Sequence, residues 1–151
     1  MSASEEILTA VQDVSRKAGI PFTITEKMVE GTQLYVVYTP LHPFPDHYTV
    51  SCGTLGFRVP FNFPDASPED CFFVLPADVK LKVPDPVRNH IDIHRAAADP
   101  NVLKGTELSG PPALVFSWHL WNSRPWDRNK HTLFDHYTHC LRRFEQQEHD
   151  G

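Results

Sequence analysis

The cysteine and histidine side chains are the groups with which this chain could do chemistry. Its three cysteines, Cys52, Cys71 and Cys140, match no CxxC spacing, and their odd number does not indicate a disulfide framework. A thiol acts as a nucleophile in its thiolate form, and Cys71 lies in an apolar stretch that would raise its pKa. We therefore expect Cys71 to be a core thiol of little reactivity, and we keep it as a candidate catalytic residue.

The nine histidines raise the question of a metal site. The densest group lies near the C-terminus and comprises His131, Asp135, His136, His139 and Cys140. Pairs three or four residues apart can share one face of a helix and bind zinc. The whole set does not converge on one point, however, and it matches no HExxH-type motif. We predict no metal site, and a zinc-binding module stays as an alternative.

Several function classes lack their sequence signals. A GxSxG turn and a glycine-rich phosphate loop are absent, so neither a hydrolase triad nor an ATP- or dinucleotide-using enzyme is expected, and no cofactor is predicted. The net charge of −5 disfavours nucleic acid as a partner, because phosphate binding needs a basic face. The first residues, MSASEEILTAVQ, lack the basic and apolar regions of a signal peptide, and no apolar run approaches the ~20 residues that cross a bilayer. We expect a cytoplasmic protein with no membrane partner.

Three tryptophans, Trp118, Trp121 and Trp126, lie within nine residues of the chain. Clustered indoles usually pack in a core, since each buries a large area and needs one partner for its N–H. Aromatic side chains also dominate binding hot spots. We therefore treat the three tryptophans as candidate binding residues.

Periodicity predicts the elements that position these side chains. An apolar stripe at helical spacing predicts a first helix that ends near Ala18, where Gly19 can adopt a left-handed conformation. β-Branched and aromatic residues then predict two antiparallel strands, 22–30 and 33–41, joined at Gly31.

The middle of the chain predicts two more strands around a proline turn. The third strand spans 48–63, and its Gly53 and Gly56 allow a bulge or bend. The turn 64–70 leads into a short apolar strand, 71–76. One face of the third strand is expected to carry Phe57, Val59, Phe61 and Phe63.

The second half has weaker signals until its end. Residues 77–112 are predicted to be a long irregular segment of the kind that forms binding loops, with a short helix near 90–98 as the alternative. An apolar patch, 113–121, follows. Asp127 or Asn129 is then expected to cap a final helix with a core-facing stripe.

Two stretches carry a resemblance to a known family. FPDASPED at 63–70, followed by Phe72-Phe73, resembles the Phe-Pro, proline turn and apolar pair of the ubiquitin-conjugating-enzyme (UBC) superfamily, and is most similar to a divergent bacterial branch. FSWH at 116–119 and RPW at 124–126 resemble the closing segment of that branch. The resemblance implies an α+β fold in which an N-terminal helix, a four-stranded antiparallel meander, a long irregular segment and a C-terminal helix form one UBC-like domain over 1–151, with a polar tail from about 145.

The resemblance also implies a function, with one departure. Catalytic members hold a ubiquitin-like protein as a thioester on a cysteine of the irregular segment, and no cysteine lies between Cys71 and Cys140. His119 lies near the corresponding catalytic position, with a structural histidine beneath the aromatic patch as the other interpretation. Pro100-Asn101 resembles the end of the family's His-Pro-Asn motif, whose asparagine supports the oxyanion, but Asp99 stands in place of the histidine. We expect a non-thioester binding module for a ubiquitin-like protein or its adenylating enzyme. An unusual transferase or hydrolase that uses His119 is the alternative.

Overall fold

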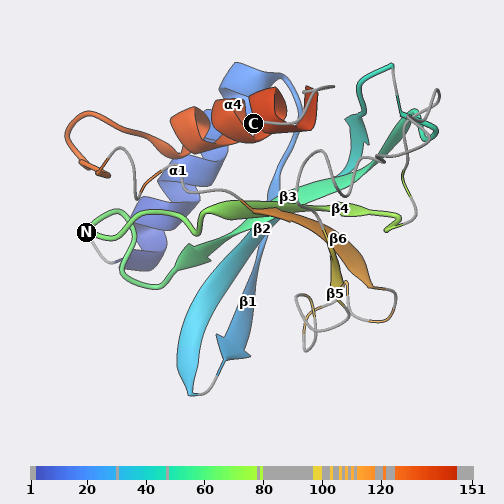
Figure 1. Cartoon of the computed structure of the whole chain (residues 1–151). Helices are drawn as coiled ribbons and strands as arrows, with labels where there is room; N and C mark the ends of the chain where they lie inside the picture. The colour runs from blue at the N-terminus through green and yellow to red at the C-terminus, as the bar shows by residue number, and fades with distance from the viewer. Residues whose placement is uncertain are drawn as a thin grey trace.

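The computed structural model of this chain describes residues 3–29, 31–46, 48–77, 79, 97–99, 103, 106, 108, 110, 112–117, 121 and 125–145. Two helices within these residues, α1 (Ala3–Ala18) and α4 (Leu133–Glu145), lie on one side of a sheet (Figure 1). Neither is long and apolar enough to cross a membrane, and no other described helix is. The predicted α+β class is confirmed.

Among the described residues the sheet has six strands in the order β1-β2-β3-β4-β6-β5, and every pair is antiparallel. The strands are β1 (Thr23–Val29), β2 (Thr32–Pro43), β3 (Cys52–Pro60), β4 (Cys71–Leu75), β5 (Ala97–Asp99) and β6 (Ala113–Ser117). The predicted four-stranded meander is confirmed as β1 to β4.

The sheet continues beyond that meander, so a prediction of four strands alone was wrong. β6 comes from the apolar patch and pairs with β4, and β5 pairs with β6. β6 is an apolar run without alternation, as is typical of a buried strand, so periodicity does not identify it. The three residues of β5 are too few to give a periodic signal. The proposed short helix near 90–98 lies mostly outside the described residues, and 97–98 belong to β5.

The main core lies between the helices and the sheet. Ile7, Val11 and Val14 form the buried stripe of α1, at most 5% exposed, as the helical spacing predicts. They pack in one cluster with inward side chains of the central strands and with α4. The sheet and α4 members of this cluster include Val37, Phe57, Val59, Phe72, Val74, Leu114, Phe116, Leu133, Tyr137, Cys140 and Phe144. A smaller cluster covers the other face of the sheet, with Leu34, Val36, Tyr38, Phe73, Leu103 and Ala113.

The pairing of β2 with β3 is close at Gly56 and irregular at one point in β2. A Cβ atom on Gly56 would lie 2.5 Å from Cζ of Phe73 and 2.7 Å from the carbonyl oxygen of Val37. The close approach of these strands therefore leaves no room for a side chain at Gly56. The predicted irregularity occurs in the partner strand, because the register of β2 against β3 shifts between Thr39 and His42.

The third strand is shorter than the sequence predicted. β3 ends at Pro60, and residues 61–65 form turns. Phe61 is consequently 51% exposed, whereas Phe63 is 4% exposed and packs in the main core. The expected continuation of one buried face to Phe61 was wrong, because the chain turns before that residue.

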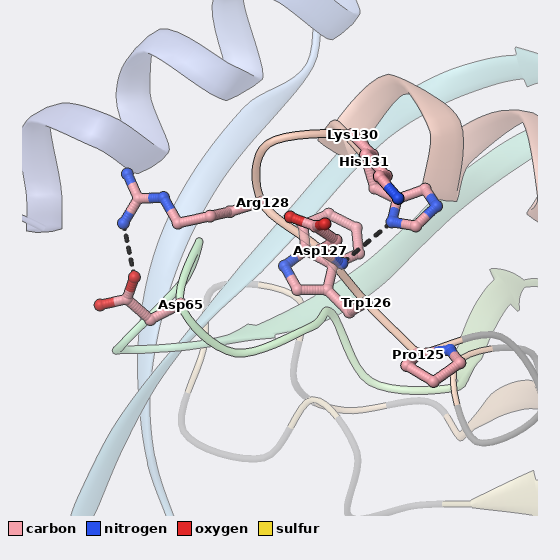
Figure 2. A pocket seen from close by; sticks show the side chains of 7 residues that line it. All are labelled: Asp65, Pro125, Trp126, Asp127, Arg128, Lys130 and His131. Carbon is pink, nitrogen blue, oxygen red and sulfur yellow. Dashed lines mark hydrogen bonds and ion pairs between the residues drawn. The ribbon is translucent and has the colours of Figure 1, made fainter.

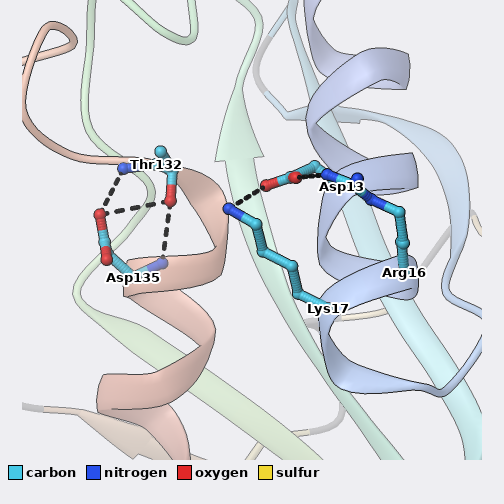
Figure 3. A network of polar contacts seen from close by, with 5 residues as sticks. All are labelled: Asp13, Arg16, Lys17, Thr132 and Asp135. Atoms are coloured by element: carbon cyan, nitrogen blue, oxygen red, sulfur yellow. Dashed lines mark hydrogen bonds and ion pairs between the residues drawn. The ribbon is translucent and has the colours of Figure 1, made fainter.

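The C-terminal helix is capped by Thr132, not by Asp127 or Asn129 as predicted. The backbone N–H of Thr132 donates to the Asp135 carboxylate at 2.7 Å, and the backbone N–H of Asp135 donates to the Thr132 hydroxyl at 3.3 Å (Figure 3). This reciprocal pair is a capping box. On the neighbouring helix, the side chains drawn in Figure 3 form a separate ion-pair group of Asp13, Arg16 and Lys17.

Candidate functional site

The structure describes three of the six candidate site residues. Cys71 lies in β4, and Trp121 and Trp126 lie between β6 and α4. Asn101, Trp118 and His119 lie outside the described residues. The site is therefore built from the two tryptophans and the side chains that contact them.

Trp121 joins the turn before β4 to α4. Its backbone N–H donates to the Asp70 carboxylate at 3.1 Å, and its indole N–H donates to Nδ1 of His136 at 3.1 Å. The ring is 6% exposed. Both N–H groups of Trp121 thus have acceptors, as buried donors require. The side chain is part of the packing between α4 and the turn before β4.

Trp126 holds the proline turn. Its indole N–H donates to the carbonyl oxygen of Pro64 at 2.7 Å, across 62 residues of sequence. Its ring lies 5.7 Å from Phe63 and meets Trp121 edge-on at 4.8 Å. The segment before α4 is therefore attached to the turn between β3 and β4.

The segment between Trp126 and α4 is a tight turn with a histidine in a defined tautomer. Lys130 and His131 both donate their backbone N–H to the Asp127 carbonyl, at 2.9 and 2.7 Å. The backbone N–H of Asp127 donates to Nδ1 of His131 at 3.0 Å. An N–H group can only donate, so Nδ1 of His131 is unprotonated and the neutral ring carries its proton on Nε2.

A surface pocket of about 650 Å³ lies between this turn and the proline turn. Figure 2 shows the Arg128 side chain extending to Asp65 on one side of the pocket and the His131 ring on the other. Arg128 forms ion pairs with both Asp65 and Glu6, and so connects the turn, the proline turn and α1. The pocket has two acidic and two basic side chains among its lining residues. These residues are Asp65, Pro125, Trp126, Asp127, Arg128, Lys130 and His131. Arg128 and Lys130 were not among the predicted site residues. The charged residues on either side of Trp126 are a signal in the sequence that could have indicated them.

Cys71 is not activated as a nucleophile. Burial, and then the negative charge of Glu69, raise the pKa of the Cys71 thiol to about 12. Glu69 Oε1 lies 3.8 Å from the sulfur and also accepts from Nε of Arg58 at 2.6 Å. The predicted direction of the Cys71 pKa shift is confirmed. Burial also raises the pKa of the Cys140 thiol well above its ordinary value.

Histidine side chains form buried hydrogen bonds that sequence analysis did not find. His42 in β2 is 4% exposed, and its Nε2 lies 2.6 Å from the Tyr137 hydroxyl of α4. His136 is fully buried, and burial lowers its pKa to about 3, with a hydrogen bond to the Cys71 main chain acting in the opposite direction. The hydrogen bond between His42 and Tyr137 joins residues 95 positions apart, so no local sequence pattern indicates it.

The C-terminal histidines do not assemble a ligand set in the described part of the chain. No group of three or more His, Cys, Asp or Glu side chains there could hold a metal ion. Nδ1 of His136 accepts from Trp121, and Nδ1 of His131 accepts from Asp127. These two nitrogens already have partners within the protein.

We compared the chain with known proteins once its geometry was clear. No family model, curated protein or solved structure matches it. The argument for function therefore depends on the side chains and on the resemblance of the strand, proline turn and strand.

Proposed function

We propose that this chain is a UBC-like protein of a bacterial ubiquitin-like conjugation or defence system. It acts in the cytoplasm as a non-thioester binding module for a ubiquitin-like protein or for its adenylating enzyme. The order of one helix, a four-stranded meander and a C-terminal helix agrees with what the resemblance implies. The proline turn that carries the resemblance joins β3 to β4.

The state of the thiols is the observation that carries the non-thioester part of the proposal. Thioester exchange needs a thiolate that attacks and later leaves, so it needs a thiol with a low pKa and open access. The pKa of Cys71 is about 12, and Cys140 is fully buried in the core. Cys52 is exposed in the first position of β3, outside the proline turn and the pocket.

The pocket at the turn before α4 supports a binding role. Trp126, a candidate binding residue, forms part of its wall, and Arg128 is restrained by two carboxylates. A restrained surface loses little side-chain entropy when a partner binds, which favours affinity. Lys130 is exposed on the same turn and can contact an acidic group of the partner.

A conjugation assay tests the proposal. The purified chain is incubated with ATP and with an adenylating enzyme and a ubiquitin-like protein from the same bacterium, and the products are compared on reducing and non-reducing gels. We expect no reducible adduct, together with a complex detectable by titration calorimetry. A reducible adduct that is lost in Cys52→Ser or Cys71→Ser would show that the chain is a thioester enzyme and would overturn the proposal.

Charge reversal on the pocket tests the binding surface in the same assay. Lys130→Glu should weaken the complex, because a charge at the rim of an interface changes association and its salt dependence. Arg16→Glu is the matched control, since Arg16 is exposed on α1 and does not line the pocket. Equal affinities for the two variants would place the binding surface elsewhere.

A further inference from the structure

Three histidine side chains bind α4 and the turn before it through unprotonated ring nitrogens. Nδ1 of His136 accepts the indole N–H of Trp121, and Nδ1 of His131 accepts the backbone N–H of Asp127. In His42, Nδ1 lies 2.6 Å from the Pro43 carbonyl oxygen. A carbonyl oxygen can only accept, so this Nδ1 carries the proton and Nε2 accepts from the Tyr137 hydroxyl. We call these three residues the histidine acceptors.

Protonation of a histidine acceptor removes its hydrogen bond. The protonated nitrogen then faces another N–H group, the indole of Trp121 or the main chain of Asp127. These two groups can only donate, so neither can accept the new proton. The Tyr137 hydroxyl could turn to accept from His42, but its own proton would then lose its acceptor in a buried site. A proton gained by His42 or His136 therefore weakens the attachment of α4.

We propose that α4 is an acid-releasable element, held at neutral pH by the hydrogen bonds of His42 with Tyr137 and of His136 with Trp121, and released when these two histidines gain protons. The proposal is independent of any role in conjugation. Release of α4 would expose the aromatic side chains beneath it and separate Trp121 from its partner.

The surroundings of the histidine acceptors favour this response. The titratable groups near His136 are Cys71 and His139, and Asp70 binds the main chain of its partner Trp121. Tyr137 lies next to His42, and Cys140 and Glu145 act on Tyr137 in turn. Burial is the largest cause that lowers the pKa of both His42 and His136. His139 lowers the pKa of His136 further, so its charge opposes an added proton.

The size of the effect follows from His136. A histidine with a pKa of about 6.5 when α4 is released and about 3 when α4 is docked makes release about 30-fold more favourable at pH 5 than at neutral pH. His42 has a pKa shifted in the same direction and adds to this factor.

Cys140 provides a direct readout, because it lies on the buried face of α4 and is 0% exposed. In a chain with Cys52→Ser and Cys71→Ser, the labelling rate of Cys140 by 4,4′-dithiodipyridine is measured at pH 7.5 and pH 5. Each rate is divided by the rate of the urea-unfolded chain at the same pH. We expect the normalised rate to rise by about 30-fold at pH 5, provided that reclosing is faster than labelling.

A second thiol distinguishes local release from global unfolding. Val36→Cys, in a chain whose other cysteines are serine, places a thiol at a 0% exposed position of β2 in the cluster on the opposite face. If only α4 is released, this thiol is exposed only by global unfolding, so its normalised rate should stay well below that of Cys140 at both pH values. Equal normalised rates at positions 36 and 140 at pH 5 would overturn the proposal, as would a normalised Cys140 rate that does not change with pH.

Substitution of the acceptors tests their role. In His136→Asn, the amide oxygen can take the place of Nδ1 as acceptor without titrating, so the rise at pH 5 should fall several-fold. In His42→Gln, the amide oxygen can take the place of Nε2 as acceptor from Tyr137, and this variant serves if His136→Asn does not fold. A full acid response in whichever of the two variants folds would show that other groups control release.

Discussion

The reactivity of Cys71 is the prediction that bears most directly on function. The perturbation is alkylation of the native protein with iodoacetamide at pH 7.5. A shift of the Cys71 pKa from its ordinary value of 9.0 to about 12 lowers the thiolate fraction about 1000-fold. A thiolate of higher pKa is intrinsically more nucleophilic, which returns a factor of about 20. Native Cys71 should therefore react roughly 50-fold more slowly than the same residue in the unfolded chain.

The assay follows each cysteine by peptide mass spectrometry over time, in native buffer and in urea. Glu69→Gln is the informative variant, because it removes the negative charge that is second only to burial in raising the Cys71 pKa. That variant should alkylate faster than the parent, with Glu26→Gln, at an exposed position of β1, as the matched control. If native Cys71 reacted within about fivefold of the unfolded chain, the argument against a Cys71 thioester would fail.

Three further predictions concern stability. The folded pKa of His136 lies below its unfolded value, so the unfolded chain binds the extra proton and the free energy of unfolding should fall by about 2 kcal/mol between pH 7 and pH 5, measured by urea titration. His136→Asn should remove most of that dependence, and an unchanged slope would contradict the assignment. Gly56→Ala should cost more than about 2 kcal/mol in the same titration, because its Cβ would lie 2.5 Å from Phe73 Cζ. Thr132→Ala should cost about 1 kcal/mol by loss of the cap, and a loss below about 0.3 kcal/mol would argue against the capping box.

Local signals made most of the fold predictable. Apolar stripes at helical spacing located α1 and α4, and the turn at Gly31, where φ is 80°, located the first hairpin. The cap of α4 was also readable, because Thr132 and Asp135 have the spacing of a capping box. The prediction that Asp127 caps the helix was wrong, because the carbonyl of Asp127 closes the turn before the helix.

The candidate site was less predictable because its contacts join distant parts of the chain. The pairing of β6 with β4 brings Ser117 beside Cys71, and no pattern within either segment specifies that pairing. The bond from Trp126 to Pro64 depends on the same packing. Sequence analysis could therefore identify the tryptophans as important without showing that they attach one element to another.

The histidines illustrate how residue type and structural role separate. Their number and spacing near the C-terminus suggested metal ligands, yet His131 and His136 each use Nδ1 to accept a hydrogen bond from the protein. A neutral acceptor of this kind stabilises the fold only while it lacks a proton, so the lowered pKa of His136 would make the attachment of α4 sensitive to pH, as we propose. The raised pKa of Cys71 is in keeping with our proposal of a non-thioester binding module. His119, two positions before Trp121, is the candidate residue of the alternative enzymatic role, and His119→Ala should leave partner binding unchanged under our proposal.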